Sequence, residues 1–367
     1  MDSVTPDLIA TAGTRLSLVD CDIHPKLAAP EDLRPFLSRR WWEHLTTIGP
    51  RQRHGFHKGV PYPKAQPLAC RRDAWPPGGG PPGSDVPFIR EQLLDLYGID
   101  FAVMNPLAPT GQGDTNAAFS AAMASANNDW QVEAMVAAEP RLRASVVVPY
   151  EDGPAAAAEI RRRAGDRRFA HVLMLSRTAE PMGQRRYWPV FEAACEAGLP
   201  LGIHVFGYSG WPMTNGGFPS FYLEEGVEHA ASTQALVASL IFEGVFARFP
   251  TLRILLIEAG FAWIPALAWR LDRIWEKARH GELQDVREPP SAILKRHFWV
   301  STQPVEEPPA FADLETTLDW IGWDRVLFAS DYPHWDFDDP RQAIPRRLGE
   351  ARRRMILSGN GRAFYGI

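Results

Sequence analysis

Eight short aliphatic runs, mostly separated by stretches of helical periodicity, constrain the fold of this chain more than any other feature. The runs span 16–23, 101–105, 144–149, 171–175, 201–206, 253–258, 298–301 and 325–330. Helical patterns at 115–138, 154–164, 186–197, 226–249 and 264–280 lie between them. Strands that alternate with helices predict an α/β fold with a parallel sheet, and eight such strands predict a (β/α)8 (TIM) barrel.

The length of the chain fits one barrel with insertions. Barrels of this kind have roughly 250 residues and commonly grow longer through their loops, so we expect residues 1–367 to form a single domain. Basic and acidic residues number 39 and 44 and are spread along the chain, for a net charge of -5. This balance argues against a nucleic-acid partner and favours a small-molecule substrate.

Two further features bear on the compartment. The three cysteines, Cys21, Cys70 and Cys195, are far apart and lack the spacing of zinc-ribbon or redox motifs. No apolar run approaches the ~18 residues that span a bilayer, and residues 1–20 do not combine a basic region with an apolar stretch. We therefore expect a cytoplasmic protein without a membrane partner.

A long insertion separates the first two predicted strands, at residues 25–98. It contains the proline- and glycine-rich segment 76–83, which is also typical of an interdomain linker. Its aromatic residues nevertheless provide apolar surface to bury, and they are Trp41, Trp42, Phe56, Tyr62 and Trp75. We therefore favour a cap that covers the mouth of the barrel.

Polar side chains capable of binding metal stand at the ends of four predicted strands. In the first strand, alternation places Asp22 and His24 on one face. His204 interrupts the apolar fifth strand, and Glu258 and Asp331 end the sixth and eighth. Carboxylate oxygen and imidazole nitrogen are ligands of zinc, iron and manganese.

Each of these residues also has an ordinary structural interpretation. Asp22 could cap a helix, and His24 and His204 could be hydrogen-bonded core histidines. However, the carboxyl ends of barrel strands all meet at one rim. A carboxylate buried there needs a cation or hydrogen-bond donors, and one metal centre would meet that need for all of them.

These motifs resemble the amidohydrolase superfamily, specifically the amidohydrolase-related group that contains aminocarboxymuconate-semialdehyde decarboxylase. The resemblance rests on DxH at 22–24, on His204, on IEAGFAWIP at 257–265 and on ASDYPHWD at 329–336. It covers the chain from about Leu16 to Tyr365 and implies a metal-bearing barrel. By the resemblance, Asp22, His24, His204 and Asp331 contact the ion.

The chain departs from the family pattern at two ligand positions and lacks one bridging residue. Many relatives have histidine where this chain has Asp22, and many have histidine where it has Glu258. The fourth strand offers no lysine to bridge two metals, since it reads HVLML at 171–175. A two-zinc hydrolase site is therefore disfavoured. We expect zinc first, with one or two iron or manganese ions as alternatives.

Further residues are candidates for the same site. Glu225 and His229 share a face if their segment is helical, and they could bind a second metal or form a surface ion pair. His334 could act in catalysis beside Asp331, bind metal or hydrogen-bond its own loop. In the insertion, Arg72 and Trp75 could hold a carboxylate substrate, because guanidinium binds carboxylate through paired hydrogen bonds.

Two catalytic functions and one noncatalytic function follow. The first is hydrolysis or nonoxidative decarboxylation of a small carboxylate-bearing molecule, with metal-activated water or a metal-polarised substrate and with Asp331 handling the proton. The second is oxygenation by a dinuclear iron or manganese centre, in a 2-aminoisobutyrate hydroxylase-like subunit or its zinc-bearing partner. The third is a noncatalytic scaffold. We expect a homodimer or a hetero-oligomer with a related subunit.

Overall fold

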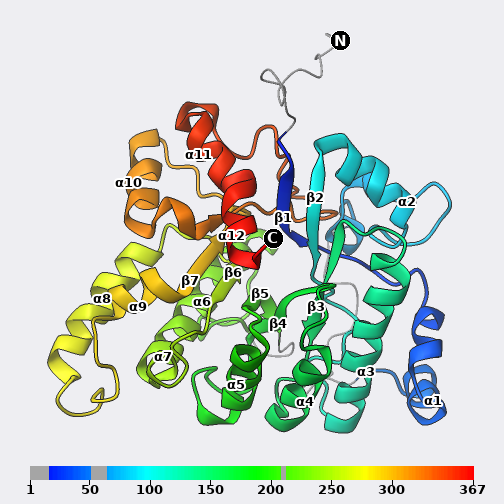
Figure 1. The fold of residues 1–367 in the computed structure, drawn as a ribbon, viewed down its shortest axis with the longest axis horizontal. Helices are drawn as coiled ribbons and strands as arrows, with labels where there is room; N and C mark the ends of the chain where they lie inside the picture. The colour runs from blue at the N-terminus through cyan, green and yellow to red at the C-terminus, as the bar shows by residue number, and fades with distance from the viewer. Residues whose placement is uncertain (1–15, 51–63, 208–211) are drawn as a thin grey trace.

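The computed structural model describes residues 16–50, 64–207 and 212–367, in which eight parallel strands form one sheet in sequence order (Figure 1). The eight expected strands are therefore confirmed. Their bounds are β1 (Leu18–Ile23), β2 (Ile99–Met104), β3 (Leu142–Val147), β4 (Phe169–Arg177), β5 (Leu201–Gly207), β6 (Ile254–Ile257), β7 (Phe298–Ser301) and β8 (Val326–Leu327).

The first and last strands close the sheet into a barrel. The backbone N–H of Cys21 donates to the carbonyl of Phe328 at 2.9 Å, and that of Asp331 donates to Asp22 at 3.1 Å. The N–H of His24 donates to the carbonyl of Tyr332 at 2.7 Å. Strand β1 is thus held on both sides, by β2 and by the segment that continues β8.

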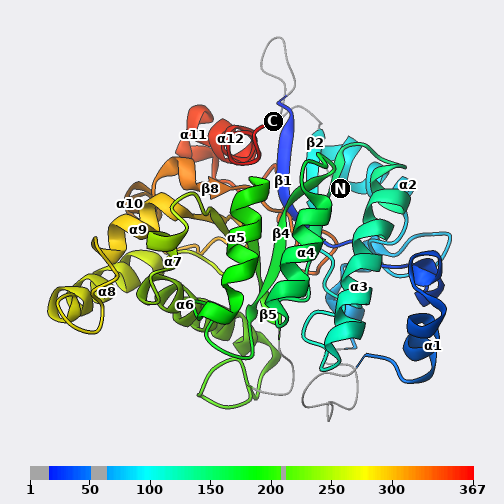
Figure 2. The same cartoon turned by 60° about the horizontal axis from the view of Figure 1, so that its bottom comes forward.

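Helices surround the strands on the outside (Figures 1 and 2). They are α1 (Arg39–Thr47), α2 (Val86–Ile89), α3 (Ala117–Trp130), α4 (Gly153–Arg163), α5 (Trp188–Ala197), α6 (Glu225–Phe242), α7 (Val245–Arg248), α8 (Ile264–Ala278), α9 (Pro290–His297), α10 (Phe311–Ile321), α11 (Glu350–Arg354) and α12 (Asn360–Tyr365). Shorter turns of 3-10 or π type continue several of them, such as η4 (Arg90–Asp95), η5 (Gln131–Val136) and η10 (Met355–Gly359).

Two expected elements are shorter than their sequence pattern. The pattern at 226–249 gives two helices, because Gly244 adopts a φ of 72° between α6 and α7. Strand β8 ends at Leu327 although the aliphatic run continues. Beyond that point the backbone N–H groups of Ala329 and Ser330 donate to the side chains of Thr302 and Asp20 instead of to a strand.

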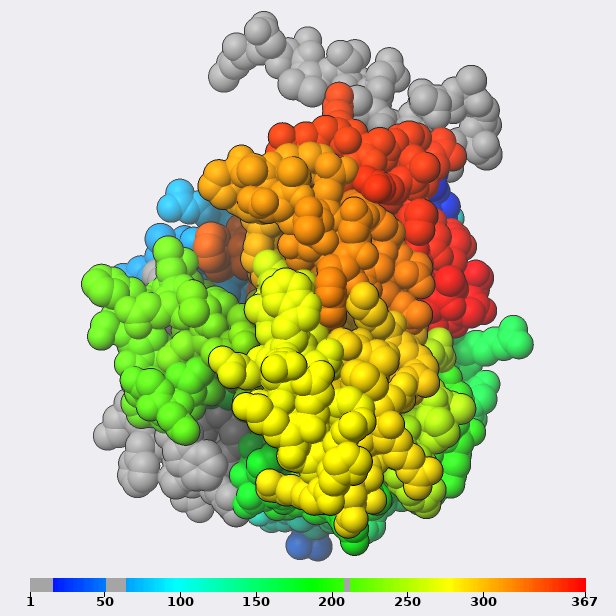
Figure 3. Space-filling model, turned by 90° about the vertical axis from the view of Figure 1, so that its left-hand side faces the viewer, coloured from blue at the N-terminus to red at the C-terminus, as the bar shows by residue number. Residues whose placement is uncertain are grey.

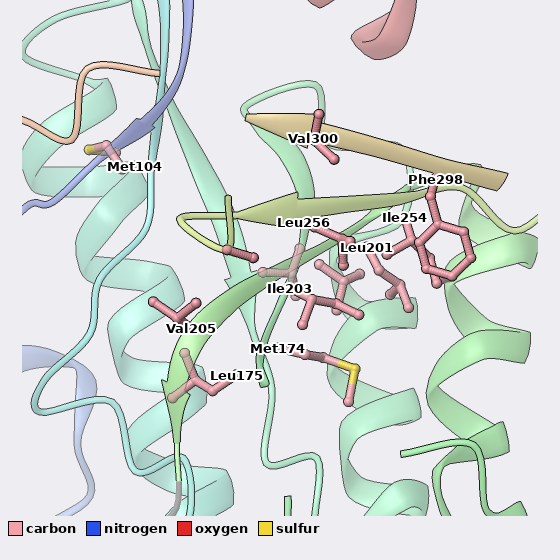
Figure 4. Close-up of a cluster of buried hydrophobic side chains, with 14 of the residues drawn as sticks. Met104, Met174, Leu175, Leu201, Ile203, Val205, Ile254, Leu256, Phe298 and Val300 are labelled. Carbon is pink, nitrogen blue, oxygen red and sulfur yellow. The ribbon is translucent and has the colours of Figure 1, made fainter. Parts of the chain in front are cut away.

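The alternation of β5 determines which side chains enter the barrel. Leu201, Ile203 and Val205 belong to the large apolar cluster between strands and helices, with residues of β4 and β6 (Figure 4). Gly202 and His204 therefore point to the opposite face, toward the barrel interior. This places a histidine at the carboxyl end of the barrel, where its buried ring faces the other strand ends.

The insertion 25–98 contacts the loop that follows β8. Cys70 and His334 form an antiparallel bridge. The N–H of Arg71 donates to Pro333, and that of Trp335 donates to Ala69, at 3.0 and 2.7 Å. The cap remains a prediction, and Phe56 and Tyr62 lie outside the described residues.

The segment that leads into α6 projects from the surface, in light green at the left of Figure 3. Phe221, Leu223 and Val227 are exposed there. Among the helices of the described part of the chain, none combines the length and the apolar character needed to cross a membrane.

Candidate metal centre

Four ligand-type side chains from three strand ends converge at one point in the barrel. One ligand atom from each of Asp22, His24, His204 and Glu258 lies within 4.8 Å of the others. Asp22 and His204 are fully buried, His24 nearly so, and the Glu258 side chain is 13% exposed. The convergence expected for the strand ends is present in the geometry.

These side chains lie close together but do not satisfy one another's hydrogen-bonding capacity. His204 Nε2 lies 2.9 Å from Glu258 Oε2 and 3.6 Å from Asp22 Oδ2, and His24 Nε2 lies 3.5 Å from Asp22 Oδ1. Yet Asp22 Oδ2, His24 Nε2, His204 Nε2 and Glu258 Oε2 are buried and make no hydrogen bond. Such atoms are costly to bury unless a cation binds them. Their donor set of two imidazoles and two carboxylates fits a divalent transition metal.

Backbone carbonyl groups on the side away from the centre orient the rings of both histidines. His24 Nδ1 lies 2.8 Å from the carbonyl of Asn105, and His204 Nδ1 lies 2.8 Å from the carbonyl of Val205. Since a carbonyl only accepts, each Nδ1 carries the proton. Each Nε2 then presents a lone pair to the centre, which is the arrangement typical of metal-binding histidine.

Asp331 and His334 lie beside this group. Asp331 Oδ1 is 2.8 Å from His24 Nε2 and 2.7 Å from His334 Nδ1. The rings of His24 and His334 stack with centroids 4.3 Å apart. Burial opposes the charge of Asp331, but His334 and His24 outweigh it and lower the pKa to about 2. A buried, ionised carboxylate therefore lies between the two rings.

Three residues at this rim adopt left-handed backbone conformations without being glycine. Phe206, Glu258 and Asp331 have φ values of 81°, 60° and 58°. Conformations of this kind are uncommon for such residues and cluster at functional sites. Phe206 lies near the end of β5, Glu258 follows β6 directly, and Asp331 lies four residues after β8, so the strain turns the chain where the ligand side chains are presented.

A further acidic residue, Asp336 in the loop after β8, also reaches the site. A carboxylate oxygen of Asp336 lies within 4.8 Å of those of Glu258 and Asp331. Gln303, after β7, donates to Asp336 at 3.1 Å and to Asp331 at 3.3 Å. Burial, with Asp331 and Glu258 nearby, raises the pKa of Asp336 to about 8. The loop after β8 therefore folds back over the barrel and brings Asp336 close to the ligand atoms.

Four other candidates are not brought into the group of ligand atoms. His229 is buried in α6, where its ring contacts that of Phe206 with centroids 4.8 Å apart, and Phe206 in turn stacks on His204 at 5.9 Å. Glu225 lies one helical turn earlier, where its charge interacts with Arg177. In the insertion, Arg72 and Trp75 are both exposed. Their proposed roles rest on the sequence alone.

Asn105, which contacts two of the candidate ligands, was missed, and so was His171, which contacts Asn105. Asn105, after β2, donates from Nδ2 to Asp22 Oδ1 at 2.8 Å, in addition to accepting from His24. Its partner is His171 of β4, with His171 Nε2 2.8 Å from Asn105 Oδ1. A polar residue that ends an aliphatic strand run is the signal that would have found Asn105.

A barrel whose strand ends gather buried carboxylates and imidazoles defines a metal-dependent enzyme class, and the comparisons with known proteins agree with it. The amidohydrolase family matches residues 19–367, so the chain belongs to that family. The family expected from the strand-end motifs is therefore confirmed.

The curated relatives include γ-resorcylate decarboxylases. The protein of Polaromonas sp. (strain JS666) is 24% identical over 77% of this chain and 91% of its own length, and that of Rhodococcus jostii is 27% identical over 68% and 78%. Among solved structures, a 5-carboxyvanillate decarboxylase of Novosphingobium aromaticivorans, complexed with manganese and 4-hydroxy-3-methoxy-5-nitrobenzoic acid, is 19% identical. It covers all of both chains with a TM-score of 0.69, which indicates the shared fold.

Proposed function

We propose that this protein is a metal-dependent nonoxidative decarboxylase that acts on a small carboxylated aromatic acid. The observation that carries the proposal is the set of four buried, hydrogen-bond-free ligand atoms next to the carboxylate of Asp331 and the His334 ring, which lies 2.7 Å from it. A cation site and a proton-handling carboxylate are the two requirements of this chemistry. The names of the relatives, which act on resorcylate and carboxyvanillate, support the substrate class.

Manganese is the metal we propose. Our first expectation, zinc, has no support in the relatives, whereas three of the similar solved structures contain manganese. Two carboxylates in the ligand set, Asp22 and Glu258, also suit a harder ion than an all-imidazole site would. When bound, the metal would supply positive charge that holds the oxygens of an anionic substrate.

The protein residues divide the remaining work. Decarboxylation replaces a carbon–carboxylate bond by a carbon–hydrogen bond, so a proton must reach the carbon that releases CO2. Because Asp331 is ionised at rest, it first takes a proton from His334 Nδ1, 2.7 Å away, and then passes that proton to the carbon. Asp331 thereby returns to its carboxylate form, and His334 regains a proton from solvent. The fully buried position of Asp331 keeps bulk water from this transfer.

The test is turnover of a substrate panel by manganese-loaded protein. Incubation with 2,6-dihydroxybenzoate, 5-carboxyvanillate and related hydroxybenzoates is expected to release CO2 at the same rate with and without oxygen. Asp331→Asn is expected to reduce kcat by about 10²–10⁴-fold, the usual contribution of a positioned proton donor, while manganese stays bound. Absence of CO2 from the whole panel would overturn the proposal.

One observation favours a second candidate, a dinuclear oxygenase. Asp336 joins Glu258 and Asp331 in a further group of carboxylates that could hold an ion, and His24, Asp331 and His334 form another. Under that alternative, turnover requires oxygen and an electron donor, and the protein carries two iron or manganese ions per chain. Oxygen consumption during turnover distinguishes the two functions in a single experiment.

A further inference from the structure

A chain of hydrogen bonds runs through the barrel interior from the last helix to a proposed metal ligand. The hydroxyl of Tyr365, in α12, lies 3.3 Å from His171 Nδ1. His171 Nε2 lies 2.8 Å from Asn105 Oδ1, and Asn105 Nδ2 lies 2.8 Å from Asp22 Oδ1. The four residues come from α12, β4, the end of β2 and β1, which are far apart in sequence.

The direction of every bond in this chain follows from its last member. The carboxylate of Asp22 can only accept, so Asn105 must present its amide N–H to it. The amide oxygen of Asn105 then faces His171, whose Nε2 must carry a proton. His171 Nδ1 is left with a lone pair, which accepts from the hydroxyl of Tyr365.

The surroundings hold His171 in the single state that this chain needs. His171 is fully buried, and burial lowers its pKa to about 3, so the ring is neutral and has one N–H. Its place depends on Gly202 of the neighbouring strand, where an added Cβ would lie 2.5 Å from His171 Nε2. The glycine at position 202 thus leaves the space that the ring of His171 occupies.

Asn105 links this chain to both ligands of the first strand. Its side chain donates to Asp22, and its backbone carbonyl accepts from His24 Nδ1. If the side-chain amide of Asn105 were flipped, its oxygen would face the carboxylate of Asp22 and repel it. The donor on His171 is what prevents that flip.

We propose that His171 and Asn105 are positioning residues for the metal centre, and that Tyr365 sets the tautomer of His171. The inference rests on the proposed function only in requiring that the strand-end ligands bind a divalent cation. Outer partners of metal ligands commonly change metal affinity by about 10–100-fold, so the effect is measurable without any substrate.

The experiment compares two variants of similar size by competition of Mn²⁺ between the protein and a chelator. His171→Leu removes the donor to Asn105 and is expected to raise the Kd for Mn²⁺ by about tenfold or more. His171→Gln can place an amide N–H where Nε2 stood, and its Kd is expected to stay near that of the unchanged protein. If His171 acted only through packing, Mn²⁺ binding would weaken equally in both variants, and the inference would be overturned.

Equal affinities for Mn²⁺ in the unchanged protein and in His171→Leu would overturn the inference while leaving the proposed function intact. Absence of Mn²⁺ binding by the unchanged protein would overturn both. Should His171→Leu fail to fold, Tyr365→Phe carries the test, because it removes one hydroxyl and preserves the ring. It is expected to weaken Mn²⁺ binding, and an unchanged Kd would contradict the tautomer role.

Discussion

The backbone of Glu258, which by the family resemblance takes the place of a histidine, shows that the position is specialised. Its φ of 60° costs of order 1–3 kcal/mol for a residue with a side chain. The hydroxyl of Ser301 accepts its N–H at 3.0 Å and helps to hold this conformation. This conformation places Oε2 of Glu258 2.9 Å from His204 Nε2.

Replacement of Glu258 is therefore expected to weaken metal binding directly. Glu258→Gln keeps the shape but removes the charge, so its Kd for Mn²⁺ is expected to rise at least about tenfold, or about 1.4 kcal/mol. Elemental analysis after dialysis measures the retained metal. Glu307→Gln, at an exposed acidic residue of the adjacent loop, is the control. Equal retention in all three proteins would remove Glu258 from the ligand set.

At the level of elements, Glu139 joins the turn after α2 to the start of β3. It accepts from Arg90 at 2.7 Å and from Arg141 at 2.9 and 2.8 Å, and it is only 5% exposed. The hydrogen bonds from Arg141 are the main cause that lowers the pKa of Glu139, to about 2. A carboxyl group with a depressed pKa in the folded state stabilises the fold above its unfolded pKa.

This ion pair makes stability fall in acid. Its contribution is complete above about pH 4.5 and is lost as the pH falls toward about 2. The shift corresponds to about 3 kcal/mol at most, and partial exposure of both arginines reduces it to about 1–2 kcal/mol. In denaturant unfolding, the free energy of unfolding of Glu139→Gln is expected to fall less between pH 5 and pH 3 than that of the unchanged protein. Glu133→Gln, at an exposed residue, should match the unchanged protein.

The alternating pattern of the strands was enough to predict the eight strands and to propose ligands on them, whereas other residues of the site depend on contacts between distant parts of the chain. Alternation in β5 is enough to turn His204 inward, because a strand has two faces. Asp336 belongs to a loop whose path is determined by long-range contacts, such as the hydrogen bond from Gln303. Asn105 ends a predicted strand, but its role depends on Asp22 and His171, which are distant from it in sequence. The positive φ of Glu258 is equally invisible in a sequence, since only the surrounding packing imposes it.

At the scale of the whole molecule, the metal centre connects β1, β5 and β6, with the segment after β8 beside it. Metal binding is therefore expected to stabilise the entire barrel. At a free Mn²⁺ concentration of 100 times Kd, the gain is about 2.7 kcal/mol. For a protein of 367 residues, whose unfolding entropy is about 2.1 cal/mol/K per residue, this raises the melting temperature by about 3–4 °C.

Calorimetry of chelated and manganese-loaded protein measures this difference. The variant His204→Ala, which lacks one ligand, is expected to melt at the same temperature in both conditions. A metal-loaded protein that melts no higher than the chelated one would contradict a cation site that links these strands.

The pairing of β1 with the segment after β8 has a consequence for biosynthesis. A ribosome releases the chain from its N-terminus, so Asp22 and His24 leave it long before Glu258 and Asp331 exist. One edge of strand β1 remains unpaired until the segment after β8 has been made, because that segment is its partner on this side. The four candidate ligands exist once Glu258 has been made, but the barrel that fixes them closes only with the segment after β8. We therefore expect stable metal loading to follow translation of nearly the whole chain.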